Sequence, residues 1–331
     1  MKKQLLIECL LCIGFCYGCT TQPKIPEFDC QLLQTITEYP DSTFFRWPEQ
    51  LCKQGNNLYV FDRTRGDVAI WDCSTQDTTF QTIGAIGPGP EEVALPKGFY
   101  VYKDTVFMAD MGALSLKAFY KGRFIRSIPT SWISEQRFFV NDGYAYLTDV
   151  TTDTACYAKI PLSLADRIDL QRIQRCGHLF QISSDEYNRS WNQRMLVKGG
   201  DYLYAVCMSY PIVEKYELAT DNLVESYDLS EIPIVQRIID NIARENLPPN
   251  AVCFYLLDIY WYKNKLYVLC TYSYKGQENI DVIVALDTSE AINPCGIYKL
   301  PRKYNSIAID DEHIYAAGPV TCTIDTYRIP Q

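Results

Sequence analysis

The stretch Asn57-Leu58-Tyr59-Val60-Phe61-Asp62 predicts the fold, because a version of it recurs five more times along the chain. Each copy has an apolar residue, an aromatic residue and then a small or apolar residue. The aromatic positions are Tyr59, Phe107, Tyr146, Tyr204, Tyr267 and Tyr315. A turn-forming group such as Gly55-Asn56-Asn57 usually precedes the copy, and a second β-rich run follows it, which is the pattern of a hairpin. The chain therefore contains six similar hairpin-forming units.

The spacing of these units predicts an all-β protein, a six-bladed β-propeller. Successive aromatic positions are 39 to 63 residues apart, about 51 on average, and a unit of this size with three or four short strands is one propeller blade. A single blade cannot bury both of its faces, so the six blades have to close into a ring. The last unit ends soon after its third strand. We therefore expect residues 32–38, which have strand character, to supply the outer strand of the last blade. A solenoid or a pair of β-sandwiches is the alternative.

The longest separation, between Tyr204 and Tyr267, predicts a short helical insertion between blades four and five. Residues 230–247 carry isoleucines at helical spacing, with Ser230 suited to the N-cap and Pro248-Pro249 at the end. We expect the apolar side of this helix to pack on the propeller. A docking helix for a partner is the alternative.

The first eighteen residues have the three-part organisation of a secretory signal, with Lys2 and Lys3, an apolar stretch over 5–15 and small residues up to Gly18. The apolar stretch is shorter than the roughly 20 residues of a membrane-spanning helix. Cys19 follows in a context that resembles the lipobox of bacterial lipoproteins, where the signal is cleaved before an acylated cysteine. We predict a signal peptide at 1–18, a lipidated tether at 19–28 and the propeller domain at 29–331. An ordinary signal cleaved nearby is the alternative.

Composition excludes several classes of protein. The chain of 331 residues is 47% hydrophobic, which is too apolar for intrinsic disorder. Its net charge of −9 argues against a nucleic-acid partner. Two histidines leave little for histidine-based catalysis or metal sites. Ten cysteines follow Cys19 without a CxxC pair, and their position in apolar runs favours buried free thiols over a disulfide framework.

One motif resembles a known family. The run Ile83-Gly84-Ala85-Ile86-Gly87-Pro88-Gly89-Pro90-Glu91-Glu92, followed by Pro96 and a strand-like segment, resembles the iGxGPgE signature of TolB-like six-bladed propellers. These are secreted lipoproteins abundant in Bacteroidota. The ring pattern covers most of the chain, whereas the specific motif covers about ten residues. The resemblance implies a propeller at the cell envelope. It implies no particular activity, because most members of the family have none assigned.

The same motif has its own physical interpretation. Gly87 and Gly89 allow backbone conformations closed to other residues, and the two prolines between and after them fix φ, so we expect a rigid turn between blades one and two. This structural reading is favoured. The functional alternative is a ligand site at one face of the ring, with Gly87, Gly89 and Glu91 as the contacts.

Three carboxylates form the other candidate site. Asp62, Asp110 and Asp149 stand three residues after the aromatic position in blades one to three, where they could converge on a channel-bound calcium ion. Ordinary turn chemistry explains the same positions, and we favour it over a metal. No cofactor is therefore predicted, with calcium as the alternative.

Together these observations predict an envelope-anchored lipoprotein propeller that acts as a non-catalytic module for binding a ligand or protein. The expected partners are the membrane, through the N-terminal lipid, and an envelope protein, peptide or glycan. The expected location is the outer membrane, facing the periplasm or the cell surface. The alternative is a propeller hydrolase or lyase that acts on glycans or lactones with a metal in the channel. Fold alone does not decide between binding and catalysis.

Overall fold

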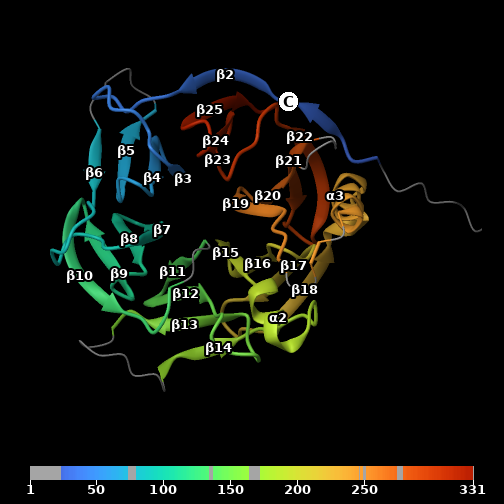
Figure 1. Cartoon of the computed structure of the whole chain (residues 1–331), viewed down its shortest axis with the longest axis horizontal. Coiled ribbons are helices and arrows are strands. Elements are labelled where there is room, and N and C mark those ends of the chain that lie inside the picture. Colours follow the sequence, from blue (N-terminus) through green and yellow to red (C-terminus); the bar gives the residue numbers. More distant parts are fainter. Residues whose placement is uncertain are drawn as a thin grey trace, which may run out of the picture.

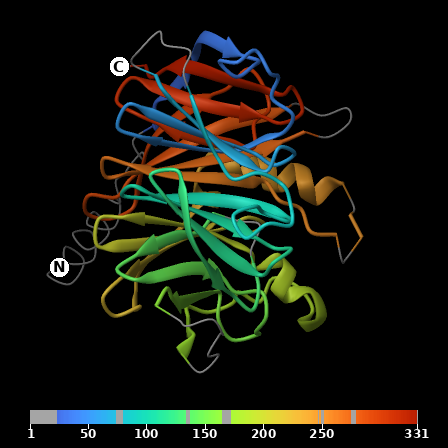
Figure 2. The same cartoon turned by 90° about the vertical axis from the view of Figure 1, so that its left-hand side faces the viewer.

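The computed structural model describes residues 24–73, 80–133, 137–163, 172–245, 247–248, 251–273 and 279–330. These residues form six antiparallel sheets arranged radially around one axis, which confirms the six-bladed propeller (Figure 1). Seen from the side, the sheets follow one another around the ring, each next to its neighbours in the sequence (Figure 2). The innermost strands contact one another in ring order, and the sixth contacts the first, so the ring is closed.

Blades one to three each contain four strands. The first blade consists of β3 (Pro48–Gln54), β4 (Asn57–Asp62), β5 (Asp67–Asp72) and β6 (Gln81–Ile83). The second consists of β7 (Pro96–Tyr102), β8 (Thr105–Asp110), β9 (Ser115–Tyr120) and β10 (Arg123–Pro129). The third consists of β11 (Phe139–Asn141), β12 (Tyr144–Thr148), β13 (Tyr157–Pro161) and β14 (Gln174–Cys176).

Blades four to six follow the same order. The fourth consists of β15 (Arg194–Gly199), β16 (Tyr202–Cys207), β17 (Ile212–Glu217) and β18 (Leu223–Asp228). The fifth contains β19 (Leu256–Tyr262), β20 (Lys265–Tyr272), β21 (Ile280–Asp287) and β22 (Asn293–Lys299). The sixth contains β23 (Ser306–Ile309), β24 (His313–Gly318) and β25 (Thr323–Arg328).

The six aromatic positions of the repeat all lie in the second strand of their blade, as predicted. Hairpin turns precede these strands, and two of them have positive φ at both central residues, as a type I′ turn requires: Asp142-Gly143 and Lys263-Asn264. The buried apolar side chains form clusters between neighbouring blades. One of these clusters joins blades five, six and one through residues such as Tyr267, Ile307 and Leu58.

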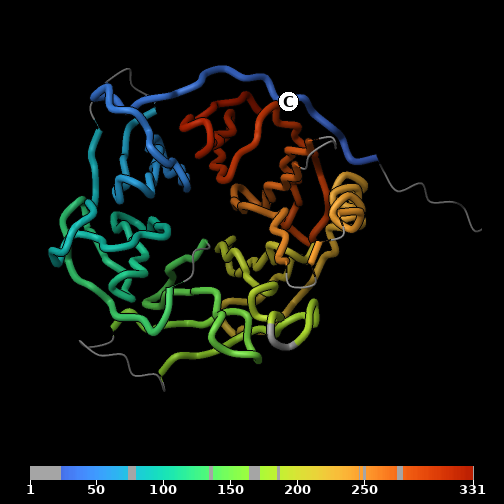
Figure 3. The backbone as a smooth tube through the Cα atoms, in the orientation of Figure 1, coloured from blue at the N-terminus to red at the C-terminus, as the bar shows by residue number. Residues whose placement is uncertain are grey.

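The N-terminal segment closes the ring, also as predicted. Strand β2 (Gln31–Ile36) pairs antiparallel with β25 and becomes the outer strand of the sixth blade. Strand β1 (Glu27–Asp29) was not predicted. It pairs parallel with β22 at the outer edge of the fifth blade, so ordered structure begins within the predicted tether. Figure 3 shows this segment running along the outside of the last two blades.

The predicted helix is present between blades four and five, but it starts later and ends earlier. A 3-10 turn, η2 (Leu229–Glu231), comes first, and α3 (Pro233–Arg244) follows. Proline suits the first position of a helix but disfavours helical conformation in the residue before it, so Pro233 sets the start. The N-cap is Ile232 and not Ser230, whose backbone N–H instead donates to the side chain of Asp228.

The buried side of α3 packs on the propeller. Val235 and Ile238 are fully buried in the apolar cluster of blades four and five, as predicted. A second helix, α2 (Asp185–Trp191), lies between blades three and four and was not predicted. None of the helices in the described part of the chain is long and apolar enough to cross a membrane.

All ten cysteines after Cys19 are unpaired within the described residues, which agrees with the expectation of free thiols. Cys156, Cys207 and Cys270 are buried, most of the others are half-buried, and Cys73 is exposed, so fewer of the thiols are buried than predicted. Burial raises the pKa of the Cys270 thiol to about 12. A thiol of this kind is inert, because the thiolate is the reactive form.

Candidate functional site

The central channel opens at the face where the first strand of each blade begins, which we call the leading face. A cavity of about 220 Å³ lies there, and we call it the channel mouth. Its lining consists of Glu49, Gln50, Lys97, Arg137, Met195, Met208, Phe254, Leu257, Asp258, Asn305 and Ser306. These residues come from or adjoin the innermost strands, so all six blades contribute to one polar depression on the axis.

Arg137 and Asp258 form an ion pair across the channel. Arg137 precedes β11 in the third blade, and Asp258 lies on β19 in the fifth. The guanidinium Nε and Nη2 donate to the two carboxylate oxygens, with an Nη2–Oδ2 distance of 2.6 Å. Both side chains are almost completely buried. Burial alone would lower the pKa of Arg137, but the carboxylate of Asp258 raises it above its usual value.

The same guanidinium also reaches blades one and six. Its Nη2 donates to the carbonyl of Leu51 at 3.1 Å and to the carbonyl of Ile307 at 3.0 Å. Asp258 in turn accepts the backbone N–H of Ile307 at 2.7 Å. We call Arg137, Asp258 and these partners the clasp. The clasp therefore joins blades one, three, five and six, and its two charged side chains are part of the lining of the channel mouth.

The rest of the channel mouth combines polar side chains with four apolar ones, Met195, Met208, Phe254 and Leu257, and its charges balance. Gln50 joins blades one and two through its side-chain amide. The amide nitrogen donates to the carbonyl of Phe99 at 2.8 Å, and the amide oxygen accepts the backbone N–H of Phe99 at 3.0 Å. Glu49 accepts a hydrogen bond from Arg63 at 3.0 Å. The lining carries two positive groups, Lys97 and Arg137, and two negative groups, Glu49 and Asp258. Asn305, which precedes β23 in the sixth blade, is half-buried and lines the same cavity.

Asp62 and Asp110, two of the predicted ligand-binding carboxylates, each fasten a loop of their own blade. Asp62 accepts the backbone N–H groups of Arg46 and Trp47, at 2.7 and 3.1 Å, and two more from the turn that follows it. Asp110 accepts those of Ala94 and Leu95 in the same way, together with two from its own turn. Both carboxylates are fully buried.

Asp149 also bonds locally. Its carboxylate accepts the N–H of Thr151 at 2.8 Å and the guanidinium Nε of Arg175 at 3.0 Å. Each of the three aspartates therefore stabilises the turn that follows the second strand of its own blade. Among the described residues, the structure has no group of three or more His, Cys, Asp or Glu side chains placed to hold a metal ion.

The glycine-rich motif forms a turn between blades one and two, as predicted. Gly87 and Gly89 do not adopt the special backbone conformations that we expected; they leave room for a neighbouring carboxylate. Gly87 and Gly89 do not have positive φ; within the motif only Gly84 does. A Cβ atom at Gly87 would overlap the carboxylate of Glu92, which accepts the N–H of Gly89 at 2.6 Å. The carboxylate that organises the turn is therefore Glu92, while Glu91 is exposed.

We expect Gly87→Ala to lower the free energy of unfolding by about 1–3 kcal/mol. The new methyl group would push the Glu92 carboxylate away from Gly89, and a hydrogen bond to a charged group contributes about that much. Urea unfolding measures the change. Glu91→Gln is the matched control and should stay within about 0.5 kcal/mol, as for most surface substitutions. Equal losses in the two variants would contradict this account of the turn.

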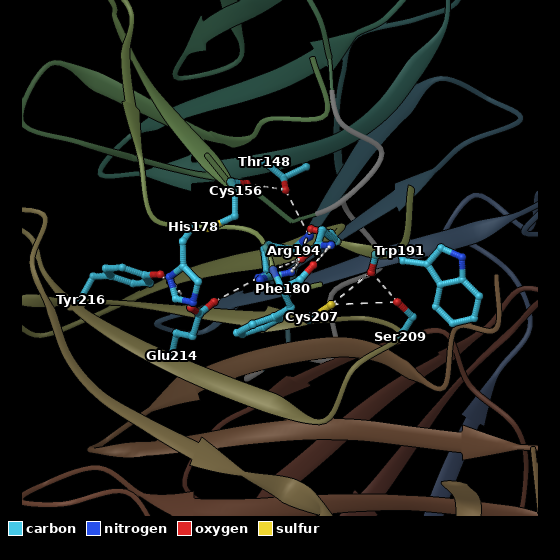
Figure 4. Close-up of polar contacts among 11 residues, drawn as sticks. Thr148, Cys156, His178, Phe180, Trp191, Arg194, Cys207, Ser209, Glu214 and Tyr216 are labelled. Carbon is cyan, nitrogen blue, oxygen red and sulfur yellow. Dashed lines mark hydrogen bonds and ion pairs between the residues drawn. The ribbon is translucent and has the colours of Figure 1, made fainter. Parts of the chain in front are cut away.

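A second buried ion pair lies between blades three and four and was not predicted (Figure 4). Arg194 is completely buried, and its Nε donates to Glu214 Oε2 at 3.1 Å. Its guanidinium lies 4.4 Å from the ring centroid of Phe180. The hydroxyl of Tyr216 donates to the other carboxylate oxygen at 2.8 Å, and Nδ1 of His178 lies 3.5 Å from it.

This arrangement is structural in character. His178 is half exposed, and its Nδ1 faces the carboxylate of Glu214. Burial raises the pKa of Cys176 to about 11, which keeps the thiol protonated at neutral pH. Cys19 and the signal peptide lie outside the described residues.

Comparison with known proteins shows the fold and nothing finer. No family model matches the chain. No curated protein matches it either. Among solved structures, a protein of Bacteroides fragilis described as exported is similar with a TM-score of 0.58 and 12% identity, covering 93% of this chain and 100% of its own. A member of the DUF4221 family from Bacteroides vulgatus has a TM-score of 0.57 and 11% identity, covering 90% of this chain and 97% of its own.

Proposed function

We propose that this chain is an envelope-anchored, TolB-like lipoprotein propeller that binds the end of an uncharged polar ligand in the channel mouth. The observation that carries the proposal is the channel mouth itself, a cavity on the leading face to which all six blades contribute and whose lining includes the charged side chains of the clasp.

The size and charge of the channel mouth suggest the kind of ligand. Its volume of about 220 Å³ is below the roughly 300–1,000 Å³ of sites that enclose a whole small molecule. The terminal unit of a longer ligand fits this volume better. Two positive and two negative groups cancel in the lining, so the binding groups favour a neutral unit rich in hydroxyls or amides. The end of a neutral glycan is the ligand of this class that we propose.

Three observations support the envelope location. Residues 1–18 have the organisation of a secretory signal, and Cys19 follows in a lipobox-like context. The similar protein of Bacteroides fragilis is described as exported. The described chain begins at the outer edge of the fifth blade, beside β22, so a tether ahead of β1 leaves the ring at its periphery (Figure 1). An anchor there keeps the channel mouth accessible.

Non-catalytic binding is also the proposal that the local chemistry favours. A hydrolase or lyase needs a group that is free to move a proton or to hold a metal. The carboxylates of Asp62, Asp110, Asp149 and Asp258 are each engaged with backbone N–H groups or arginines. They therefore stabilise the ring and its turns.

The test uses the Cys19→Ala chain, which we expect in the soluble fraction because the acyl group is the proposed anchor. A panel of neutral oligosaccharides is screened by thermal shift, and the dissociation constant of each binder is measured by calorimetry. We expect Asn305→Ala to weaken binding about fivefold or more, since one hydrogen bond contributes about 1 kcal/mol.

Glu312→Gln, in the turn at the opposite face, is the control and should leave the affinity unchanged. Binding that Asn305→Ala does not affect would contradict the channel mouth as the site. Calcium-dependent turnover of an oligosaccharide would instead favour the hydrolase or lyase.

A further inference from the structure

A second cavity on the leading face differs from the channel mouth in its chemistry. It has a volume of about 330 Å³ and lies between the loop after β16, the end of β18 and helix α3. The side chains that define it are Trp191, Tyr210, Asp228, Ile239, Ile242 and Tyr255. Its volume is within the range of sites that hold a small molecule.

The cavity is separate from the channel mouth. The N–H of Tyr255 donates to the carbonyl of Met208 at 3.1 Å, which holds the segment before β19 against the end of the fourth blade. Met208 and Phe254 face the channel mouth, whereas the residues that follow them, Ser209 and Tyr255, line the second cavity. The two cavities therefore lie on opposite sides of one ridge.

Three of the residues that line the second cavity are aromatic: Trp191, Tyr210 and Tyr255. Trp191 is the last residue of α2. Its backbone carbonyl accepts a hydrogen bond from the hydroxyl of Ser209, and its indole points away from the Arg194 network (Figure 4). Tyr210 is partly exposed, and its ring lies 5.0 Å from that of Phe180. Tyr255 is buried, with 4% of its surface exposed. Ring faces attract cations through their quadrupole.

The charge of the lining has one sign. Among the described residues that line this cavity, Asp228 is the one with a formal charge at neutral pH. Its Oδ1 accepts the N–H of Ser230 at 2.8 Å, which fixes the carboxylate at the start of η2. The other carboxylate oxygen, Oδ2, accepts no hydrogen bond from the described residues, and Asp228 lines the cavity. A fixed carboxylate beside aromatic rings, without a cationic side chain, is complementary to an ammonium group.

We propose that this cavity binds an organic ammonium ion that carries an apolar group. The ammonium pairs with Asp228 and contacts the aromatic rings, while the apolar group packs on Ile239 and Ile242. Each of these contacts is of a known kind: a charge-assisted hydrogen bond, a cation–π contact and apolar burial. The inference does not depend on the ligand of the channel mouth.

The test compares three probes of one shape and different charge: 2-phenylethylammonium, 2-phenylethanol and phenylacetate. Binding to the Cys19→Ala chain is followed by ligand-observed NMR titration at neutral pH. We expect the ammonium to bind at least about tenfold more tightly than the alcohol, as a charge-assisted hydrogen bond warrants. We expect phenylacetate to bind more weakly than either.

Asp228→Asn removes the charge and keeps the bond to Ser230, because asparagine is an equally good N-cap residue. It should reduce the tenfold preference for the ammonium to about one. Glu231→Gln, three residues away and outside the lining, should leave the preference intact. Ile239→Trp, at a half-buried position, should fill the cavity and abolish binding of both ammonium and alcohol.

Three results would overturn the proposal: equal affinities of the folded protein for all three probes, no binding of the ammonium, or a preference unchanged by Asp228→Asn. None of them bears on the channel mouth, because Asn305→Ala and Asp228→Asn change different cavities. Failure of this proposal is therefore distinguishable from failure of the glycan proposal.

Discussion

We expect Asp258→Leu to lower the free energy of unfolding by about 3–5 kcal/mol, because it leaves the guanidinium of Arg137 buried without a counter-ion. The substitution also removes the acceptor for the N–H of Ile307, a contact between blades five and six. Urea unfolding followed by circular dichroism measures the change, provided that the slope with denaturant stays constant.

Two controls identify the origin of that loss. The double variant Arg137→Met/Asp258→Leu should recover much of it, since replacing both partners of a buried pair is far less costly than removing one. Asp311→Asn breaks the exposed ion pair between Lys263 and Asp311, where both side chains are more than 60% exposed, and should cost less than about 1 kcal/mol. If Asp258→Leu cost no more than Asp311→Asn, the clasp would not be a stabilising element.

We expect removal of strand β2 to be the most destabilising truncation at the N-terminus. Five residue pairs join β2 to β25, and at about one hydrogen bond for each pair and about 0.5–1.5 kcal/mol for each bond their loss costs about 2.5–7.5 kcal/mol. The side chains of β2 are mostly exposed, so the backbone ladder accounts for most of this figure. A chain that begins at Thr37 lacks the strand.

The matched control is a chain that begins at Cys30. It keeps β2 but lacks β1, which pairs with β22 over three residues, and by the same measure should lose about 1.5–4.5 kcal/mol. Comparing the two chains by thermal and urea unfolding isolates the contribution of β2. Equal stability of the two chains would show that β2 does not close the ring.

The fold was predictable because its signal is local and repeated. Each second strand carries an aromatic residue such as Tyr204, and a tight turn fixes the hairpin before it, so six short windows predicted six blades. The pairing of residues 32–36 with β25 followed from the incomplete last blade. The start of α3 was missed because the isoleucine spacing was given more weight than Pro233, whose ring determines where the helix begins.

The polar interior was not predictable in the same way. Arg137 and Asp258 are 121 residues apart in sequence, and no local motif links them. The one available signal was the presence of charge in an innermost strand, since a buried charge requires a partner. The role of Glu92 was missed for a related reason, because the spacing of Gly87 and Gly89 suggested special backbone angles and not room for a neighbouring carboxylate.

The pairing of β2 with β25 also determines the order in which the molecule can be completed. Leu32 lies opposite Tyr327, far along the chain, so β2 is synthesised long before the strand with which it pairs. Contacts of such long separation form slowly, because the intervening chain has to be brought together first. During that interval the edges of β2 and of the sixth blade are both exposed. A nascent chain interrupted before Thr323 therefore retains two unpaired strand edges, that of β2 and that of β24, and such edges can pair with other chains.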